Sequence, residues 1–148
     1  LWTVTHNTDF AEGFIGLIGN PHAVGEAFQI TSDETLTWNQ IYKIIADALR
    51  VELKPYYVAS EFLDAVGDYD FNGSLTGDKS NSVVFDNTKL KNAVPEFKAV
   101  VRAETGIKQT VDYVLSHREC QVEDKEFDVW CDKVIEKLEK AKKEIKND

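Results

Sequence analysis

Gly13-Phe14-Ile15-Gly16-Leu17-Ile18-Gly19 spaces three glycines like the turn that cradles a dinucleotide's pyrophosphate between a strand and a helix. Such a turn needs a strand that runs directly into the first glycine and a helix that opens after the last one. Here a polar segment, residues 6–12, precedes Gly13, and Asn20-Pro21 follows Gly19. We therefore interpret the stretch as one face of a helix whose small residues allow close packing. We expect this chain to bind no cofactor by itself.

The residues around this stretch predict a short strand, a helix and a second strand. Residues 2–5 alternate like the end of a strand, and N-cap residues at 7–9 predict a helix that starts near Asp9 and stops at Gly19-Asn20-Pro21. The segment 23–30 is apolar enough to be a strand.

The rest of the chain predicts mostly helices. Thr37 should cap a helix with a continuous apolar face, and Ser60 a short helix through Val66. Residues 67–82 hold three glycines and no clear periodicity, which predicts a long loop, and residues 83–85 predict a brief strand. Further helices should begin near residues 88, 104 and 124. The predicted fold class is mixed α/β and helix-rich, in one unit.

Composition restricts the class of protein. The 148 residues carry a net charge of -9, which argues against nucleic-acid binding, and no apolar run is long enough to cross a membrane. The absence of methionine favours a processed or excised chain, and the absence of an export signal favours a cytoplasmic location. For Cys120 and Cys131 two alternatives stay open: free thiols in a reducing cytosol, or a disulfide.

Catalytic and metal-binding motifs are missing from the sequence. None of the five tyrosines has a lysine four residues later, and the three histidines lie far apart, at positions 6, 22 and 117. We therefore predict no catalytic residues and no metal ligands in this chain.

Five fragments nevertheless resemble, in order and spacing, the carboxy-terminal part of NAD-dependent epimerases/dehydratases of the extended short-chain dehydrogenase/reductase family. They are Thr5-His6-Asn7-Thr8-Asp9-Phe10-Ala11, Gly25-Glu26-Ala27-Phe28-Gln29-Ile30, Leu36-Thr37-Trp38 with Ala46-Asp47-Ala48-Leu49, Phe85-Asp86-Asn87-Thr88-Lys89-Leu90, and Thr105-Gly106-Ile107-Lys108-Gln109-Thr110-Val111.

The resemblance implies that the chain is a C-terminal fragment of an NAD(P)-binding Rossmann-type α/β protein. Residues 1–30 would be the last helix and strand of the Rossmann domain, residues 31–123 the substrate-binding lid, and residues 124–148 an appended amphipathic helix. The parent would be an enzyme that uses NAD or NADP, and the lid would receive a small-molecule substrate such as a nucleotide sugar. Cofactor and catalytic residues would lie in the other half.

The resemblance also points to substrate contacts. Relatives carry Arg-x-Gly-Asp before the helix that begins Asp-x-Ser/Thr-Lys, whereas this chain has Leu75-Thr76-Gly77-Asp78, which lacks the arginine. We predict that Asp78, Lys79 and Ser80 contact the substrate. The alternative is that these residues only satisfy a solvated turn.

Two rival functions remain open from the sequence. One is a non-enzymatic binding or scaffold member of the same superfamily, and the other is an interaction module built on the helix after Asp124. The isolated chain is also expected to expose the apolar side chains of its first helix, which permits self-association.

Overall fold

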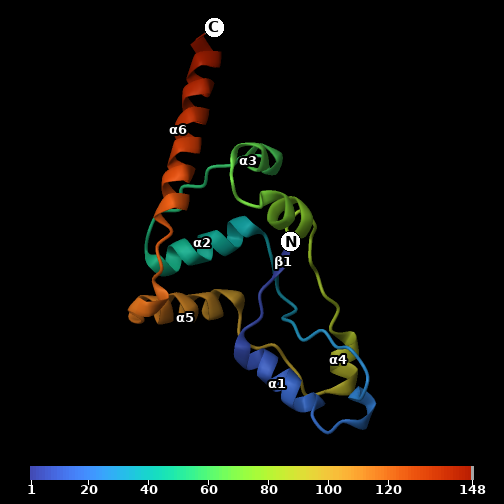
Figure 1. Ribbon diagram of the computed structural model, residues 1–148. Helices are drawn as coiled ribbons and strands as arrows, with labels where there is room; N and C mark the ends of the chain where they lie inside the picture. Colours follow the sequence, from blue (N-terminus) through green and yellow to red (C-terminus); the bar gives the residue numbers. More distant parts are fainter. Residues whose placement is uncertain (148) are drawn as a thin grey trace.

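The computed structural model describes residues 1–147 and consists mainly of helices joined by extended segments (Figure 1). Its elements in chain order are β1 (Trp2–Thr3), α1 (Asn7–Leu17), η1 (Pro21–Ala23), β2 (Thr35–Leu36), α2 (Trp38–Leu49), α3 (Ser60–Val66), η2 (Asn72–Asp78), α4 (Thr88–Ala93), α5 (Ala103–Ser116), η3 (Arg118–Cys120) and α6 (Lys125–Asn147). The helix-rich, mixed α/β class is confirmed. The only sheet among these residues has two strands.

Helices α2 and α5 form the middle of the molecule and lie next to each other (Figure 1). The predicted cap of α2 is confirmed, because Thr37 and Gln40 form a reciprocal capping box. The buried Ile41 and Ala46 belong to its apolar face. Helix α5 receives its cap from a distant residue: the Glu34 carboxylate accepts a hydrogen bond from the Ala103 backbone at 2.7 Å. An acceptor at this position also complements the positive end of the helix dipole.

The first residues of the chain bring three segments together. Trp2 pairs with Leu36 and Thr3 with Thr35 in the antiparallel β1–β2 ladder. The Val83 backbone then donates a 2.9 Å hydrogen bond to the Leu1 carbonyl. The strand predicted over residues 83–85 is nevertheless wrong, because this contact does not extend into a ladder.

Helix α1 packs closely at one end of the molecule, beside α4 (Figure 1). Gly13 and Gly16 lie inside the helix, so the interpretation as a packing face is confirmed for these two glycines. Gly19 lies beyond the end of the helix, with a left-handed φ of 78°. A Cβ atom on Gly13 would come within 2.7 Å of the Ile30 side chain, and one on Gly16 would clash with Val94.

Two buried polar side chains connect this end of the fold. Asp9, which is 1% exposed, accepts a 3.0 Å hydrogen bond from the Val101 backbone through Oδ2. Its other oxygen has no partner among the described residues. Asn87, 3% exposed, donates to the Thr31 carbonyl at 2.6 Å and accepts from the Thr31 hydroxyl at 3.1 Å. Both contacts join segments more than fifty residues apart, so they fix the path of the chain between the helices.

The strand predicted over residues 23–30 is wrong. Ala23 ends the short helix η1, Gly25 takes a left-handed φ of 78°, and residues 26–30 run without a ladder. Among the described residues no strand lies beside this segment, and extended backbone becomes a strand only when a neighbour satisfies its hydrogen bonds. Lys89 holds the segment instead, through the Glu26 carboxylate at 2.6 Å and the Ala27 carbonyl at 3.0 Å.

The loop predicted over residues 67–82 is wrong in its centre, where residues 72–78 form the π-helix η2. Two carboxylates satisfy its first backbone N–H groups: Asp64 accepts from Asn72 at 3.0 Å and Asp70 from Gly73 at 2.8 Å. At the other end the Lys79 backbone donates to the Ser74 carbonyl, the wider spacing of a π-helix. Side-chain caps therefore stabilise η2, whose sequence lacks the apolar periodicity from which a helix is predicted.

Helix α6 starts as expected after Asp124, whose carboxylate accepts from the Phe127 backbone at 3.0 Å, and it projects away from the other helices (Figure 1). Apart from the exposed Val129, its apolar residues up to Leu138 are half-buried, and residues 141–147 are exposed. Asp148, the last residue of the predicted appendage, lies outside the described residues. No helix in residues 1–147 is both long and apolar enough to span a bilayer.

Candidate functional site

A cavity of about 430 Å³ lies between the start of α2 and the π-helix η2. It includes two of the three residues that the sequence analysis predicted as substrate contacts. Its lining residues are Trp38, Tyr42, Ser60, Leu75, Lys79 and Ser80. Small-molecule sites usually have volumes of about 300–1,000 Å³ and combine apolar walls with a few polar groups, and this cavity fits that description.

Helix α2 provides an aromatic wall. Trp38 and Tyr42 lie four residues apart, so their side chains share one face of the helix, and their ring centroids are 6.1 Å apart. The Trp2 ring lies 5.4 Å from that of Trp38 on the other side. The capping box at Thr37 fixes the first turn of α2 and thereby the position of Trp38. Tyr42 is 54% exposed, which leaves its ring available to a ligand.

The opposite wall carries the positive charge. Lys79 follows η2, and its ammonium group contacts the Asp78 carboxylate at 2.9 Å and the Ser74 carbonyl at 3.3 Å. A lysine ammonium has three N–H donors, so one remains for a ligand. Ser80 donates its hydroxyl to the Thr76 carbonyl at 2.6 Å and accepts from the Asn81 side-chain amide at 3.3 Å, so its oxygen can accept one more hydrogen bond. The Ser60 hydroxyl makes no hydrogen bond among the described residues, which leaves it free as donor and acceptor.

Aromatic side chains from α6 pack against the two aromatic residues that come just before η2. Four rings form this aromatic cluster, with neighbouring centroids 5.0–5.9 Å apart: Tyr69, Phe71, Phe127 and Trp130. Such separations allow favourable edge-to-face and offset-stacked pairs. Gly67 permits the approach, because a Cβ atom there would lie 2.9 Å from both Phe71 and Trp130. The C-terminal helix thus supports the segment that leads to Lys79 and Ser80.

The cluster borders a small apolar hollow of about 220 Å³. Cys131 and Tyr56 contribute to its lining. Burial raises the pKa of the Cys131 thiol, with further contributions from the neighbouring carboxylates of Asp128 and Asp132. A thiol whose pKa is raised is a poor nucleophile at neutral pH. Cys120 and Cys131 are both free thiols in this structure, not a disulfide.

The structure brings together some predicted site residues and adds others. Lys79 and Ser80 line the cavity, whereas Asp78 does not line it and pairs with Lys79. The aromatic wall and the hydroxyl of Ser60 were not predicted from the sequence. The spacing of Trp38 and Tyr42 was a usable signal, because two aromatic residues four positions apart at the start of a helix share a face. Nothing in the sequence indicated that η2 would lie opposite them.

The glycine stretch does not form the turn that holds a dinucleotide cofactor. The three glycines that match the spacing of a pyrophosphate-binding turn lie at positions 13, 16 and 19, the first two inside α1 and turned toward Ile30 and Val94. A pyrophosphate requires exposed backbone N–H groups at the start of a helix, and N–H groups inside a helix are already bonded. Within residues 1–147, no three His, Cys, Asp or Glu side chains are grouped so as to hold a metal ion.

In comparisons with protein-family models, curated proteins and solved structures, this chain finds no match.

Proposed function

We propose that this chain forms the substrate-binding part of an NAD-dependent epimerase/dehydratase of Rossmann type, and that its substrate is a nucleotide sugar or a related anion. The cofactor and the catalytic residues would belong to another part of the polypeptide. The observation that carries the proposal is the cavity in which Lys79 and two serine hydroxyls face the rings of Trp38 and Tyr42.

Each wall of the cavity suits one part of such a substrate. A lysine ammonium attracts phosphate as a point charge, and the free Ser60 hydroxyl can donate to a phosphate or sugar oxygen. The Ser80 hydroxyl already donates to Thr76, so it offers a ligand only an acceptor. The aromatic rings offer flat faces on which a planar base can stack. The ordered fragments between residues 5 and 111 supply the family to which this chemistry is assigned.

The contacts of Lys79 also limit the binding free energy that it can contribute. Its ammonium is already paired with Asp78, and the lysine side chain is 36% exposed. A phosphate must therefore compete with a carboxylate 2.9 Å away. We expect a contribution at the lower end of the range for a charged hydrogen bond, about 1.5 kcal/mol.

Calorimetric titration of the chain with uridine diphosphate glucose measures binding and tests the proposal. Lys79→Ala should raise the Kd about tenfold, which corresponds to about 1.4 kcal/mol. Lys54→Ala is the matched control, because Lys54 is another exposed lysine beside an acidic residue, Glu52 at 3.4 Å. In the intact parent the same change should raise KM and leave kcat nearly unchanged, since the contact would serve ground state and transition state alike.

Two results would contradict the proposal. One is the absence of saturable binding by the unaltered chain at ligand concentrations of about 1 mM and above. The other is a Kd that changes less than about twofold in Lys79→Ala, an effect too small for a lost charged contact. Circular dichroism of each variant ensures that a lost affinity is not a lost fold.

A further inference from the structure

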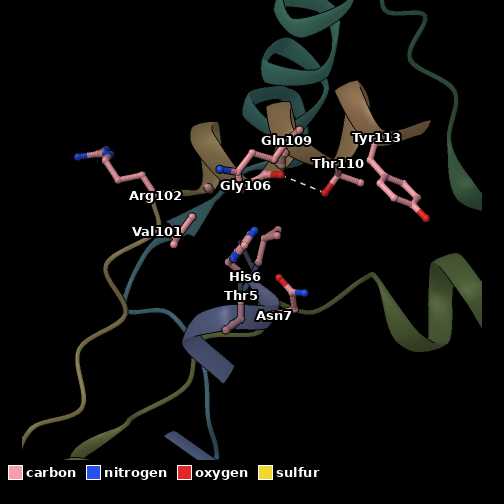
Figure 2. Close-up of a pocket in the computed structure, with 12 residues that line it drawn as sticks. Thr5, His6, Asn7, Val101, Arg102, Gly106, Gln109, Thr110 and Tyr113 are labelled. Atoms are coloured by element: carbon pink, nitrogen blue, oxygen red, sulfur yellow. Dashed lines mark hydrogen bonds between the residues drawn. The ribbon is translucent and has the colours of Figure 1, made fainter. Parts of the chain in front are cut away.

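A second groove, of about 440 Å³, lies between the residues that lead into α1 and the first three turns of α5. Figure 2 shows His6 and Asn7 facing the α5 residues across this space. None of its lining residues belongs to the cavity at Lys79. The polar residues of the groove are Thr5, His6, Asn7, Arg102, Gln109, Thr110 and Tyr113.

The hydrogen bonds of His6 determine what its ring offers. Its Nδ1 atom accepts from the Thr8 backbone N–H at 3.3 Å and lies 2.7 Å from the Thr8 hydroxyl. In a neutral imidazole only one nitrogen carries the hydrogen, so an accepting Nδ1 leaves Nε2 as a donor. The ring edge containing Cδ2 faces α5, because a Cβ atom on Gly106 would lie 3.0 Å from His6 Cδ2. The groove therefore receives the Cδ2–Nε2 edge of the imidazole, with Nε2 as an N–H donor, beside Gly106.

The groove has little net charge. Its one guanidinium group, that of Arg102, is paired with the Glu34 carboxylate at 2.9 Å. The same carboxylate accepts from the Ala103 backbone, so both of its oxygens are occupied. Glu34 therefore offsets the charge of the guanidinium, although this exposed group keeps further N–H donors. A free cation meets no unpaired carboxylate among the lining residues.

Neutral hydrogen-bonding groups remain free. Among the described residues, the side-chain amides of Asn7 and Gln109 and the hydroxyl of Tyr113 make no hydrogen bonds. An amide offers both donors and an acceptor, and a phenol offers one of each. Tyr113 stacks on His117 at 3.9 Å, which limits the movement of its ring. Apolar side chains of Val4 and Ile107 also contribute to the lining.

From these groups we infer that the groove binds an uncharged, polyhydroxylated ligand of monosaccharide to disaccharide size. Each sugar hydroxyl is both donor and acceptor, which matches the two amides, the Nε2–H group and the phenol. The C–H faces of a sugar ring suit the Val4, Gly106 and Ile107 surface. This site is independent of the proposed function, because it shares no residue with the Lys79 cavity.

Two-dimensional NMR of the full chain tests this inference with D-glucose, D-galactose, N-acetyl-D-glucosamine and maltose as probes. At least one should produce saturable shifts with a Kd below about 10 mM, an affinity of about 2.7 kcal/mol. The shifting amides should belong to residues 4–7 and 102–113. In Asn7→Ala/Gln109→Ala the Kd should rise at least about tenfold, the loss expected for two hydrogen bonds.

Two control variants separate this site from other effects. Asn92→Ala removes an exposed amide on α4 and should leave the Kd unchanged. Lys79→Ala should also leave it unchanged, so failure here and failure of the proposed function can be told apart. The inference is overturned if no probe gives saturable shifts at about 50 mM, if the shifts cluster elsewhere, or if the double variant binds as well as the unaltered chain.

Discussion

The two ends of the molecule are stabilised by different interactions. At the α1 and α4 end, buried groups stabilise the fold. Leu90 is 1% exposed, and Asp9 and Asn87 make hydrogen bonds to backbone groups of distant segments. At the α6 and η2 end, no residue is fully buried, and the helix is attached by half-buried aromatic rings.

Hydrogen bonds of buried groups are directional and allow one arrangement, whereas ring contacts tolerate small movements. We therefore expect the α1 and α4 end to resist local opening more than the α6 and η2 end. The candidate cavity at Lys79 is built on the more adaptable end, which is the usual location of ligand-binding segments.

The largest effect should come from Leu90→Ala. Removing a fully buried leucine side chain costs about 2–5 kcal/mol of unfolding free energy, because it loses burial and leaves a void. Urea unfolding followed by circular dichroism measures this loss. Leu115→Ala, at a leucine that is 55% exposed, is the matched control and should cost less than about 1 kcal/mol. Equal losses in the two variants would mean that the α4 end holds no dominant core.

Trp130→Ala should have an intermediate and more local effect. The ring is half-buried, so we expect a cost of about 2 kcal/mol, below the range for a fully buried tryptophan. Hydrogen exchange should accelerate in η2 and α6 but not in α1 and α4. Val129 lies on the exposed side of the same helix, at 68% exposure. Val129→Ala should therefore change neither the unfolding free energy nor the hydrogen exchange of η2 and α6. Faster exchange throughout the chain would show that the two ends are not independent.

The smallest effect concerns the hydrogen bond from Tyr56 to Glu139, 3.0 Å long. Hydrogen bonds from Lys142 and then Tyr56 lower the pKa of the Glu139 carboxyl below its ordinary value of 4.5. The folded pKa lies below the unfolded one, so this contribution is complete above pH 4.5 and is lost as the pH falls through the folded pKa.

Amide exchange of residues 134–140 at decreasing pH, compared with Glu139→Gln, measures this small effect. The variant should lack the acid-dependent loss of protection. Because the carboxylate is on the surface, the change should also shrink at high salt. An identical pH profile in the two proteins would show that this contact does not tether α6.

Sequence patterns predicted those elements that local interactions determine. Helix α2 has an apolar face and a capping box within its own thirteen residues from Thr37, and both are visible in the sequence. The segment 23–30 has strand-like composition, but a strand depends on a neighbour that composition does not specify. The π-helix η2 depends on Asp64 and Asp70 as caps and on Trp130, which lies more than fifty residues further along the chain.

The candidate site divides in the same way. Lys79 and Ser80 were predicted as substrate contacts because they follow a fragment that resembles a family motif, so the neighbouring sequence was enough to identify them. Trp38 and Tyr42 join them only through the fold, at a separation of about forty positions that no local pattern encodes.

The pairing of β1 bears on the order in which the chain folds. Leu1 and Thr3 contact Val83 across eighty or more residues, whereas the backbone hydrogen bonds within α2 and α5 are local. Closing a loop of that length costs roughly 4 kcal/mol of chain entropy, and two or three hydrogen bonds cannot offset this before the intervening helices have shortened the gap. Residues 1–3 should therefore dock late, after the helices have formed, and complete the connection between α2 and the segment that follows η2.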